Sequence, residues 1–329
     1  MPRNCLRVNS SYKKSQGKEP NKKLSGQLSK PLSYQLPLSH LLLALAIVAV
    51  WGTNFVVIKI SLDSFPPFLF AALRYVFAFL PAVLFLPRPK VSWTNLCVYG
   101  LAVGVGQFGV LYFAIDGNIS PGLASLVIQT QVFFTIGFAM LFAKEGLKLY
   151  QAIAVAVAMI GLGIIAVHTD ATTTFLGLAL VVFCGFSWGV ANTASRRAGA
   201  INMLSYVVWA SLFAIPPLFA ISWIFEGGWG QISTAITSAS SGAWLGVFWQ
   251  SWGNTLFGYG AWAWLLSKHP AAVVAPAPLL VPIFGMGAAA FFLSEPLPLW
   301  KILAAGLVIL GLMVNLFWPS LRNLLRRHL

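Results

Sequence analysis

Apolar stretches long enough to cross a lipid bilayer recur along nearly the whole chain. A transmembrane helix needs about 20 predominantly apolar residues, and such windows occur ten times. They fall at residues 38–59, 66–87, 95–115, 119–143, 149–167, 174–195, 203–225, 243–267, 270–294 and 302–318. Each window is continuously apolar, unlike the alternating strands of a membrane barrel, and helices satisfy their own backbone hydrogen bonds in lipid. The sequence therefore predicts an all-α membrane protein with ten transmembrane helices.

Composition supports the same location. Hydrophobic residues make up 58% of the 329 positions and charged residues only 9%, so a water-soluble globule would expose a very large apolar surface. The first 36 residues are instead polar and rich in Ser, Lys and Arg. No cleaved signal peptide is expected, because this stretch is too long for one and the next apolar run has full span length. Residues 1–37 are predicted to be a basic, disordered cytoplasmic tail.

The distribution of basic residues predicts the orientation. If the tail is cytoplasmic, 18 of the 21 Lys and Arg residues fall in the tail, the inner loops and a basic C-terminus at residues 319–329. This asymmetry follows the positive-inside rule, so both termini are expected on the cytoplasmic side of a bacterial inner (plasma) membrane. The basic residues form no single stripe, so the net charge of +14 indicates no nucleic-acid partner. The expected partners are membrane lipid and a small-molecule metabolite.

The two halves of the chain, residues 38–168 and 174–318, share an ordered set of marker residues. The matched pairs are Trp51 and Trp188, Gly52 and Gly189, Asn54 and Asn192, Lys59 and Arg196, Pro81 and Pro216, Pro121 and Pro270, and Glu145 and Glu295. Five spans per half is an odd number, so the second half must enter the membrane from the opposite side. The sequence thus predicts two inverted five-helix repeats, an arrangement typical of transporters with a site near the midplane. The alternative is a chance alignment of apolar helices that contain Pro and Gly.

Several of these segments resemble a known family. The similarity lies in Trp51-Gly52-Thr53-Asn54-Phe55-Val56-Val57-Ile58-Lys59, in Leu73-Arg74, in Arg88-Pro89-Lys90-Val91, and in Gly122-Leu123-Ala124-Ser125-Leu126-Val127-Ile128-Gln129-Thr130-Gln131 followed by Phe133-Phe134-Thr135. On these residues the chain resembles EamA-type drug/metabolite transporters, most of all the bacterial exporters of cysteine and O-acetylserine. The resemblance implies two EamA repeats, cytoplasmic termini, a central cavity between the halves and efflux of small metabolites. The long basic tail and Lys144-Glu145-Gly146 at the end of the fourth span depart from the family pattern.

Polar side chains within the spans are the candidates for substrate contact, because they are costly in lipid and usually face the protein interior or a water-filled path. Together with two tryptophans, the predicted substrate-binding residues are Trp51, Asn54, Arg74, Gln107, Gln129, Gln131, Trp188, Asn192, Gln250 and Asn254. An aromatic ring beside an amide suits a small amphipathic solute, since the ring packs on its carbon skeleton while the amide bonds its amino or carboxylate group. The alternative for each amide is that it only bonds neighbouring helices together.

Three of these positions carry geometric expectations. Gln129 and Gln131 are two residues apart, about 200° around a helix, so both are not expected to face one cavity. Arg74 lies roughly 12 Å into its span at 1.5 Å per residue, and no span contains an Asp or Glu to neutralise it. Its side chain must therefore bond backbone carbonyls, extend to the outer interface or meet a substrate carboxylate.

The ninth span contains three prolines, Pro276, Pro278 and Pro282. Proline removes a backbone donor and clashes with the preceding turn, so this helix is predicted to kink or break. A break near the midplane would supply a hinge for transport. A passive kink that only shapes packing is the alternative.

The ionisable residues bear on energy coupling. The seven acidic residues lie in the tail, in loops or at span ends, and the four histidines are also peripheral. A proton-coupled pump usually needs a titratable group along its path, so facilitated efflux is predicted, or else coupling through a boundary carboxylate such as Glu145 or Glu295. The three cysteines have no spacing typical of a disulfide or a metal site, and neither a metal nor a cofactor is expected.

Two short motifs match enzyme signatures. Gly185-Phe186-Ser187-Trp188-Gly189 fits the serine-hydrolase pattern, and Gly104-Val105-Gly106-Gln107-Phe108-Gly109 fits the dinucleotide fingerprint. Both lie inside apolar helices without the strand that each motif requires, so no enzyme is expected.

The sequence predicts an inner-membrane exporter of small amino-acid-like metabolites that uses alternating access and exists as a monomer or homodimer. The alternatives are an importer, a broad-specificity amino-acid or drug exporter that could be proton-coupled, a non-transporting receptor and, more remotely, an intramembrane enzyme.

Overall fold

The computed structural model describes residues 36–143, 148–168, 172–269, 271–274 and 276–328. Most of the predicted tail, together with Glu145 and Pro270, lies outside these described residues. Every regular element in the described part of the chain is a helix, as predicted. The elements are α1 (Leu38–Leu62), α2 (Pro67–Val83), α3 (Trp93–Gly100), η1 (Leu101–Gly109), α4 (Val110–Ile115), α5 (Pro121–Val127), η2 (Ile128–Thr130), α6 (Gln131–Ala143), α7 (Leu149–Val167), α8 (Phe175–Ala198), α9 (Met203–Phe225), α10 (Gly228–Ser238), α11 (Ser241–Phe248), η3 (Trp249–Phe257), α12 (Gly258–Lys268), α13 (Ala271–Val274), η4 (Ala277–Leu280), α14 (Val281–Leu293) and α15 (Leu299–His328).

Helical residues fill most of each predicted window. By length and composition, seven helices of the described chain could cross a membrane: Leu38–Leu62, Trp93–Ile115, Pro121–Phe142, Leu149–Val167, Phe175–Ala198, Met203–Phe225 and Leu299–Trp318. Two further apolar helices, Pro67–Val83 and Ala277–Leu293, are shorter. The predicted count of ten spans goes beyond these seven and stays a prediction.

Four segments depart from regular α-helix, and they occupy matching places in the two halves. The π-helical segments η1 and η3 lie in the third and eighth predicted windows, and the 3-10 segments η2 and η4 lie in the fourth and ninth. Such π-helical insertions occur often at functional sites. The break predicted in the ninth window is present, because the α-helix is interrupted between α13 and α14 by a turn and the 3-10 segment η4.

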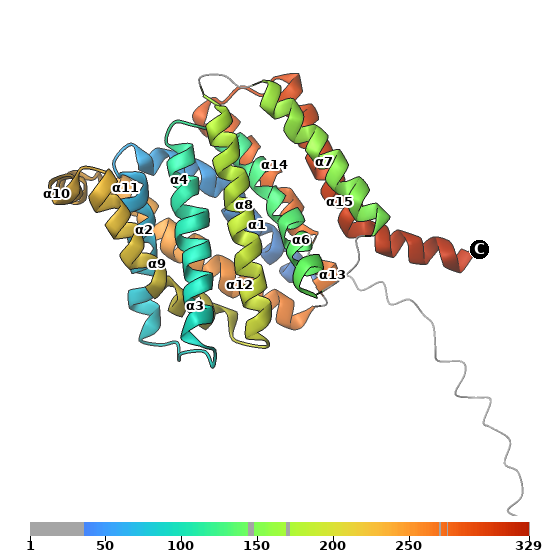
Figure 1. Cartoon of the computed structure of the whole chain (residues 1–329), viewed down its shortest axis with the longest axis horizontal. Coiled ribbons are helices and arrows are strands. Elements are labelled where there is room, and N and C mark those ends of the chain that lie inside the picture. Colours follow the sequence, from blue (N-terminus) through green and yellow to red (C-terminus); the bar gives the residue numbers. More distant parts are fainter. Residues whose placement is uncertain (1–35, 144–147, 169–171, 270, 275, 329) are drawn as a thin grey trace, which may run out of the picture. The chain divides into compact units, whose positions relative to one another are not determined.

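Helices at matching places in the two halves pack side by side. The three pairs are α2 with α9, α5 with α14, and α7 with α15, the last of which is plain in Figure 1. Each pair runs antiparallel. For α7 and α15, a Cβ added at Gly161 would lie 2.9 Å from the Ala304 carbonyl oxygen, and one added at Gly311 would lie 2.6 Å from the Ala154 carbonyl oxygen. Glycine therefore permits the close approach of these two helices, as is common in membrane proteins.

One helix has no counterpart among the predicted spans. Helix α10 begins at Gly228, and Gly227 and Gly228 take φ angles of 91° and 71°, a conformation that glycine adopts without strain. Only Ile232 and Ala235 of this helix are buried. The apolar windows did not reveal it because its mixed composition and 11 residues fall short of a span.

The close contact between α7 and α15 can be tested with a matched pair of glycine variants. Gly161→Leu places a side chain where there is no room, and overpacking of this kind costs roughly 1–3 kcal/mol, so the melting temperature of the purified protein in detergent should fall. Gly163 lies two residues further along the same helix and has nothing within 4 Å of an added Cβ. Gly163→Leu should therefore leave the melting temperature unchanged or slightly higher. Equal losses in both variants would contradict the packing described.

Candidate functional site

A cavity of about 920 Å³ lies between helices of the two halves. The first half contributes α1, η1 and the η2–α6 segment, and the second contributes α8, the start of α9, the η3–α12 segment and η4. Its volume falls within the range of about 300–1,000 Å³ that is usual for small-molecule sites. All four irregular segments thus border the same space, which places non-α backbone at the candidate site.

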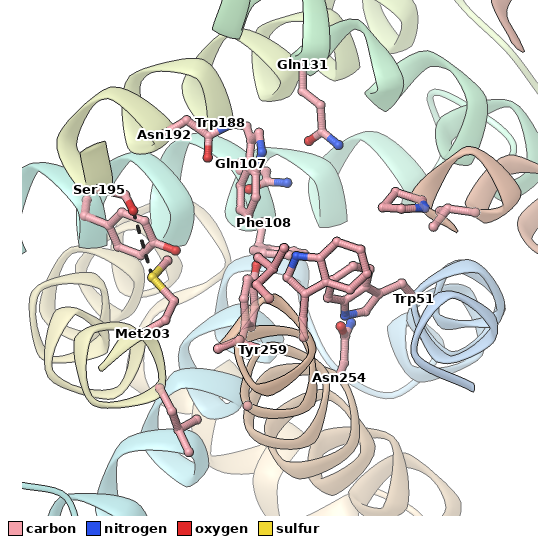
Figure 2. Close-up of a pocket in the computed structure, with 18 of the residues that line it drawn as sticks. Trp51, Gln107, Phe108, Gln131, Trp188, Asn192, Ser195, Met203, Asn254 and Tyr259 are labelled. Atoms are coloured by element: carbon pink, nitrogen blue, oxygen red, sulfur yellow. Dashed lines mark hydrogen bonds between the residues drawn. The ribbon is translucent and has the colours of Figure 1, made fainter. Parts of the chain in front are cut away.

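Eight of the ten predicted residues line this cavity: Trp51, Asn54, Gln107, Gln129, Gln131, Trp188, Asn192 and Asn254. Pro278 of the predicted hinge also lines it, whereas Pro276 and Pro282 do not. Figure 2 shows side chains from distant parts of the chain, among them Trp51, Gln107, Trp188 and Asn254, around one space.

The expectation that Gln129 and Gln131 face different ways is wrong. Both side chains line the cavity, and the Gln131 side-chain amide donates to Gln129 Oε1 at 3.5 Å. The expectation assumed a regular α-helix through both residues. The 3-10 segment Ile128–Thr130 changes the rotation per residue between them, and the long side chains cover the remaining difference.

Aromatic rings form one wall of the cavity. The ring of Trp51 lies 6.0 Å from that of Tyr259 and 5.5 Å from that of Trp262, and Trp188 lies 6.3 Å from Tyr259. The four rings join α1 to α8 and α12. Sequence reasoning missed Tyr259 and Trp262. The available signal was their position in the predicted span 243–267, which also carries the candidate amides Gln250 and Asn254.

Two amides on the cavity wall have oxygen atoms without a hydrogen-bond partner. Asn54 and Gln107 are buried, at 3% and 5% exposure, and neither Asn54 Oδ1 nor Gln107 Oε1 accepts a hydrogen bond from any described residue. Leaving a buried acceptor unpaired costs free energy, so such atoms are rare unless a ligand or water completes them. These two oxygen atoms therefore mark where a donor on a bound solute would be stabilised.

Asn192 is different, because it already bonds a neighbouring helix. Its side-chain amide donates to Thr135 Oγ1 at 3.0 Å, which ties α8 to α6. Asn192 and Asn54, which are paired in the predicted repeat, thus differ in their bonding. The contact between helices thus uses one amide hydrogen of Asn192. Because Asn192 also lines the cavity, the rest of its amide group stays a predicted substrate contact.

Arg74 and Gln250 are the two predicted residues that do not line the cavity. Both are fully buried, at 0% exposure. The guanidinium of Arg74 donates to Thr255 Oγ1 at 3.0 Å, to Tyr112 Oη at 3.0 Å and to Gln250 Oε1 at 3.2 Å. Two of the three expected environments of Arg74, the outer interface and backbone carbonyls, are therefore wrong, because side-chain acceptors from two other helices surround it. Contact with a substrate carboxylate stays a prediction. Sequence reasoning did not identify Tyr112 and Thr255, because hydroxyl side chains were not among the polar candidates.

The lining of the cavity extends toward one end of the helix bundle. It continues past Trp188 and Asn192 to Ser195 at the end of α8, to Met203 at the start of α9 and to Ser267 near the end of α12. Figure 2 shows the contact between Ser195 and Met203 as a dashed line. The basic residues Arg196, Arg197 and Lys268 follow at the same helix ends.

At the opposite end, two carboxylates bond the N-termini of first-half helices. Glu226, just after α9, accepts from the amides of Phe68 and Leu69 in the first turn of α2, at 2.8 and 3.1 Å. Glu295, just after α14, accepts from Ser120 Oγ and from the amide of Gly122 at 3.0 Å, at the start of α5. Helix N-termini favour negative charge, so each carboxylate stabilises an antiparallel pair at its end.

Lys301 completes the contact at Glu295. Its ammonium lies 3.0 Å from Glu295 Oε1, and both side chains are almost completely buried. Ser294, with a left-handed φ of 55°, ends α14 and reverses the chain toward Glu295.

Asp116, just after α4, also lies outside the spans. Partial burial raises the pKa of its carboxyl, Lys59 opposes that rise and Asp63 adds to it.

The enzyme-like motifs do not form catalytic turns. Ser187 lies within the continuous helix α8, and the glycine-rich segment 104–109 lies within the π-helical η1. In the described residues no strand precedes either motif.

The fold and the cavity together define the chain as a multi-pass helical membrane protein with an internal polar and aromatic cavity, the class to which transporters belong.

Comparison with known proteins identifies the family. The model of the EamA-like transporter family matches residues 38–167 and 175–317, and the chain belongs to this family. The family predicted from the sequence is thereby confirmed.

Individual relatives agree with this assignment. A protein of Salmonella typhimurium named "probable amino-acid metabolite efflux pump" is 36% identical over 290 residues, which cover 86% of this chain and 97% of the relative. A protein of Escherichia coli with the same name is 36% identical over 281 residues, covering 84% and 94%. One solved crystal structure aligns with a TM-score of 0.59 at 17% identity, covering 84% of this chain and 95% of the other, and supports the fold.

The role of the unpartnered amide can be tested with Asn54→Ala. Loss of one hydrogen bond to a charged group of the solute corresponds to roughly 1.5–3 kcal/mol, so transport at low substrate concentration should fall about tenfold or more, while membrane abundance and melting temperature stay near those of the unmodified protein. Asn95→Ala is the matched control. Asn95 bonds the Ala194 carbonyl at 2.8 Å and the Tyr206 hydroxyl at 2.6 Å, away from this cavity.

The control should show the opposite pattern, with a lower melting temperature and transport reduced only in proportion to the folded protein. If Asn54→Ala instead loses stability and transport together, Asn54 bonds helices and is not a substrate contact.

Proposed function

We propose that the chain is an inner-membrane exporter of small amino-acid-like metabolites that works by alternating access. The observation that carries the proposal is the cavity, in which buried amide oxygens without partners and aromatic rings share a space of suitable size. The name of the two relatives, a probable amino-acid metabolite efflux pump, supports the same substrate class. Cysteine and O-acetylserine are the first candidates within it.

The proposed architecture is ten spans in two inverted halves of five. Three observations support it: the family model matches two segments of similar length, the π and 3-10 segments occupy matching spans, and helices at matching places pack antiparallel. An inverted repeat produces the last of these, because equivalent helices of the two halves cross the membrane in opposite directions.

The proposed orientation has both termini in the cytoplasm. The positive-inside rule then places the ends of α8 and α12 on the cytoplasmic side. Because the cavity lining reaches those ends, the conformation described corresponds to a state that loads substrate from the cytoplasm. The contacts of Glu226 and Glu295 lie at the outer end and close it.

Export requires the outer contacts to open while the inner end closes. The carboxylate contacts of Glu226 and Glu295 join helices of different halves, so rocking of one half against the other would break them. The interrupted segment at Pro276, Pro278 and Pro282 is the proposed hinge, because the 3-10 turn η4 there lacks the full α-helical hydrogen-bond ladder.

The proposal has two alternatives, one for the range of substrates and one for the coupling to protons. A broad-specificity amino-acid or drug exporter is favoured by the Trp and Tyr wall, which would also accept aromatic solutes. Proton coupling is favoured only by carboxylates at the outer end, such as Glu295, because the acidic residues of the described chain lie outside the cavity lining. Facilitated efflux down the metabolite gradient is therefore the proposed mode.

The function can be tested in proteoliposomes loaded with labelled L-cysteine or O-acetyl-L-serine. Protein-containing vesicles should release the label several-fold faster than empty vesicles, and an imposed pH gradient should not drive either solute uphill. A release rate equal to that of empty vesicles for both solutes would contradict the proposed substrates. Uphill movement driven by the pH gradient would show proton coupling instead of facilitated efflux.

The outer closure can be tested with Glu295→Gln. This change removes the charge that pairs with Lys301 and that favours the N-terminus of α5, so the outer end should open more often. A cysteine placed at Ser125, in a background with Cys5, Cys97 and Cys184 replaced by Ala, should then react several-fold faster with a membrane-impermeant maleimide added outside.

Asp63→Asn is the matched control for this variant, because Asp63 is an exposed carboxylate at the end of α1 on the same side of the molecule. It should leave the labelling rate unchanged. Equal labelling in the Glu295→Gln variant and the unmodified protein would mean that Glu295 does not hold the outer end closed.

A further inference from the structure

A positively charged side chain, Arg74, is buried beside the cavity with no carboxylate partner among the residues that the structure describes. Arg74 is 0% exposed and stays protonated under all physiological conditions. The groups that it bonds, Thr255, Tyr112 and Gln250, are all neutral. The ion pair between Lys301 and Glu295 lies at the outer end and includes none of these groups. A buried charge that is hydrogen-bonded but not neutralised is costly, so a function that requires it is expected.

Two hydrogen-bond donors in the group around Arg74 are unused. Arg74 Nη2 and Gln250 Nε2 are both buried and have no acceptor within the described residues. The orientation of the Gln250 amide is well determined, because its Oε1 accepts from Tyr112 Oη at 2.8 Å and from Asn254 Nδ2 at 3.3 Å in addition to Arg74. Rotating the amide by 180° would place its NH₂ against these donors. The site therefore lacks an acceptor and carries a positive charge.

The ring of Phe108 borders both this site and the cavity. Phe108 lines the cavity, and Arg74 Cζ lies 3.7 Å from the centre of its ring, within cation–π distance. Asn254, which bonds Gln250, also lines the cavity. Phe108 belongs to the π-helical segment η1, whose hydrogen bonding is irregular and whose backbone includes three glycines. Rotation of this ring would connect Arg74 to the cavity.

The unpaired atoms on the cavity wall have the opposite character. Asn54 Oδ1 and Gln107 Oε1 are acceptors without donors, and the rings of Trp51 and Tyr259 present faces that attract cations. The cavity thus offers acceptors and aromatic faces on its wall, and donors with a positive charge behind Phe108. A solute with an ammonium group and a carboxylate group would satisfy both.

We infer that Arg74 and Gln250 form a carboxylate-binding site, reached when Phe108 rotates, which selects zwitterionic α-amino acids among the small metabolites. The inference rests on the proposed function and narrows its substrate class. The carboxylate accepts from Arg74 Nη2 and Gln250 Nε2 and neutralises the buried charge. The ammonium group lies against the Asn54 and Gln107 oxygens and the aromatic wall. Amides and esters of the same amino acids keep the ammonium group but lose the anionic charge, so they bind poorly.

The test is competition against labelled L-cysteine exchange in proteoliposomes. The competitors are S-methyl-L-cysteine and its α-amide, which differ only at the carboxyl group. In the unmodified protein the acid should compete at a concentration at least about tenfold lower than the amide, because a site built to bond a group rejects analogues that lack it. Equal competition by acid and amide would overturn the inference and leave export itself standing. Absence of any cysteine exchange would overturn both.

Gln250→Glu is the decisive variant. The new carboxylate is nearly isosteric with the amide and lies next to Arg74, so it neutralises the guanidinium from within the protein. The melting temperature should not fall, whereas competition by the acid should weaken about tenfold or more and competition by the amide should be unchanged or stronger. Gln231→Glu, on the exposed surface of α10, is the matched control and should preserve the difference between acid and amide.

The reverse result has a clear meaning. If Gln250→Glu folds and still prefers the acid as strongly as the unmodified protein does, then Arg74 and Gln250 serve only to bond helices. Arg74→Lys provides a second measurement, since it keeps the charge but loses the planar guanidinium. It should retain part of the preference for the acid, and an unchanged preference would count against a direct contact with the guanidinium.

Discussion

Antiparallel packing of helices from the two halves is the arrangement on which the cavity depends. Helices α2 and α9, α5 and α14, and α7 and α15 form three such pairs. Two of the pairs are bonded at one end by a carboxylate on a helix N-terminus, Glu226 on α2 and Glu295 on α5. Glycines such as Gly161 let the third approach closely. Because these contacts leave α1, α8, η1 and η3 around a common space, polar groups gather there without contact with lipid.

Several polar groups in and beside that space have atoms without a hydrogen-bond partner among the described residues. The unpaired acceptors and the unpaired donors lie in different places. Acceptors without donors belong to Asn54 and Gln107 on the wall, and donors without acceptors belong to Arg74 and Gln250 behind Phe108. In a low-dielectric interior each unpaired group is costly. The family assignment and the names of the relatives indicate a transporter, and the unpaired atoms describe the solute that such a transporter would stabilise.

Sequence and structure agreed where the argument depended on local chemistry. Eight of the ten predicted residues line the cavity because a polar side chain in an apolar helix has few other places to lie. Disagreement arose where a regular helix was assumed. Gln129 and Gln131 both face the cavity because a 3-10 segment lies between them, and Arg74 bonds side chains of other helices instead of extending to the interface. Tyr259 and Trp262 were missed because aromatic residues are common in spans, and their contacts with Trp51 and Trp188 are seen only in the structure.

The sequence by itself determined the all-helical membrane character and the family, because hydrophobic length and motif residues are properties of short stretches of chain. It also indicated the break at Pro276, Pro278 and Pro282, since proline acts on its own helix. The tertiary structure decided which polar atoms are paired. Tyr112, Thr255 and Gln250 reach Arg74 from positions 38 to 181 residues away. No local pattern predicts such contacts, because they depend on how helices remote in sequence lie together.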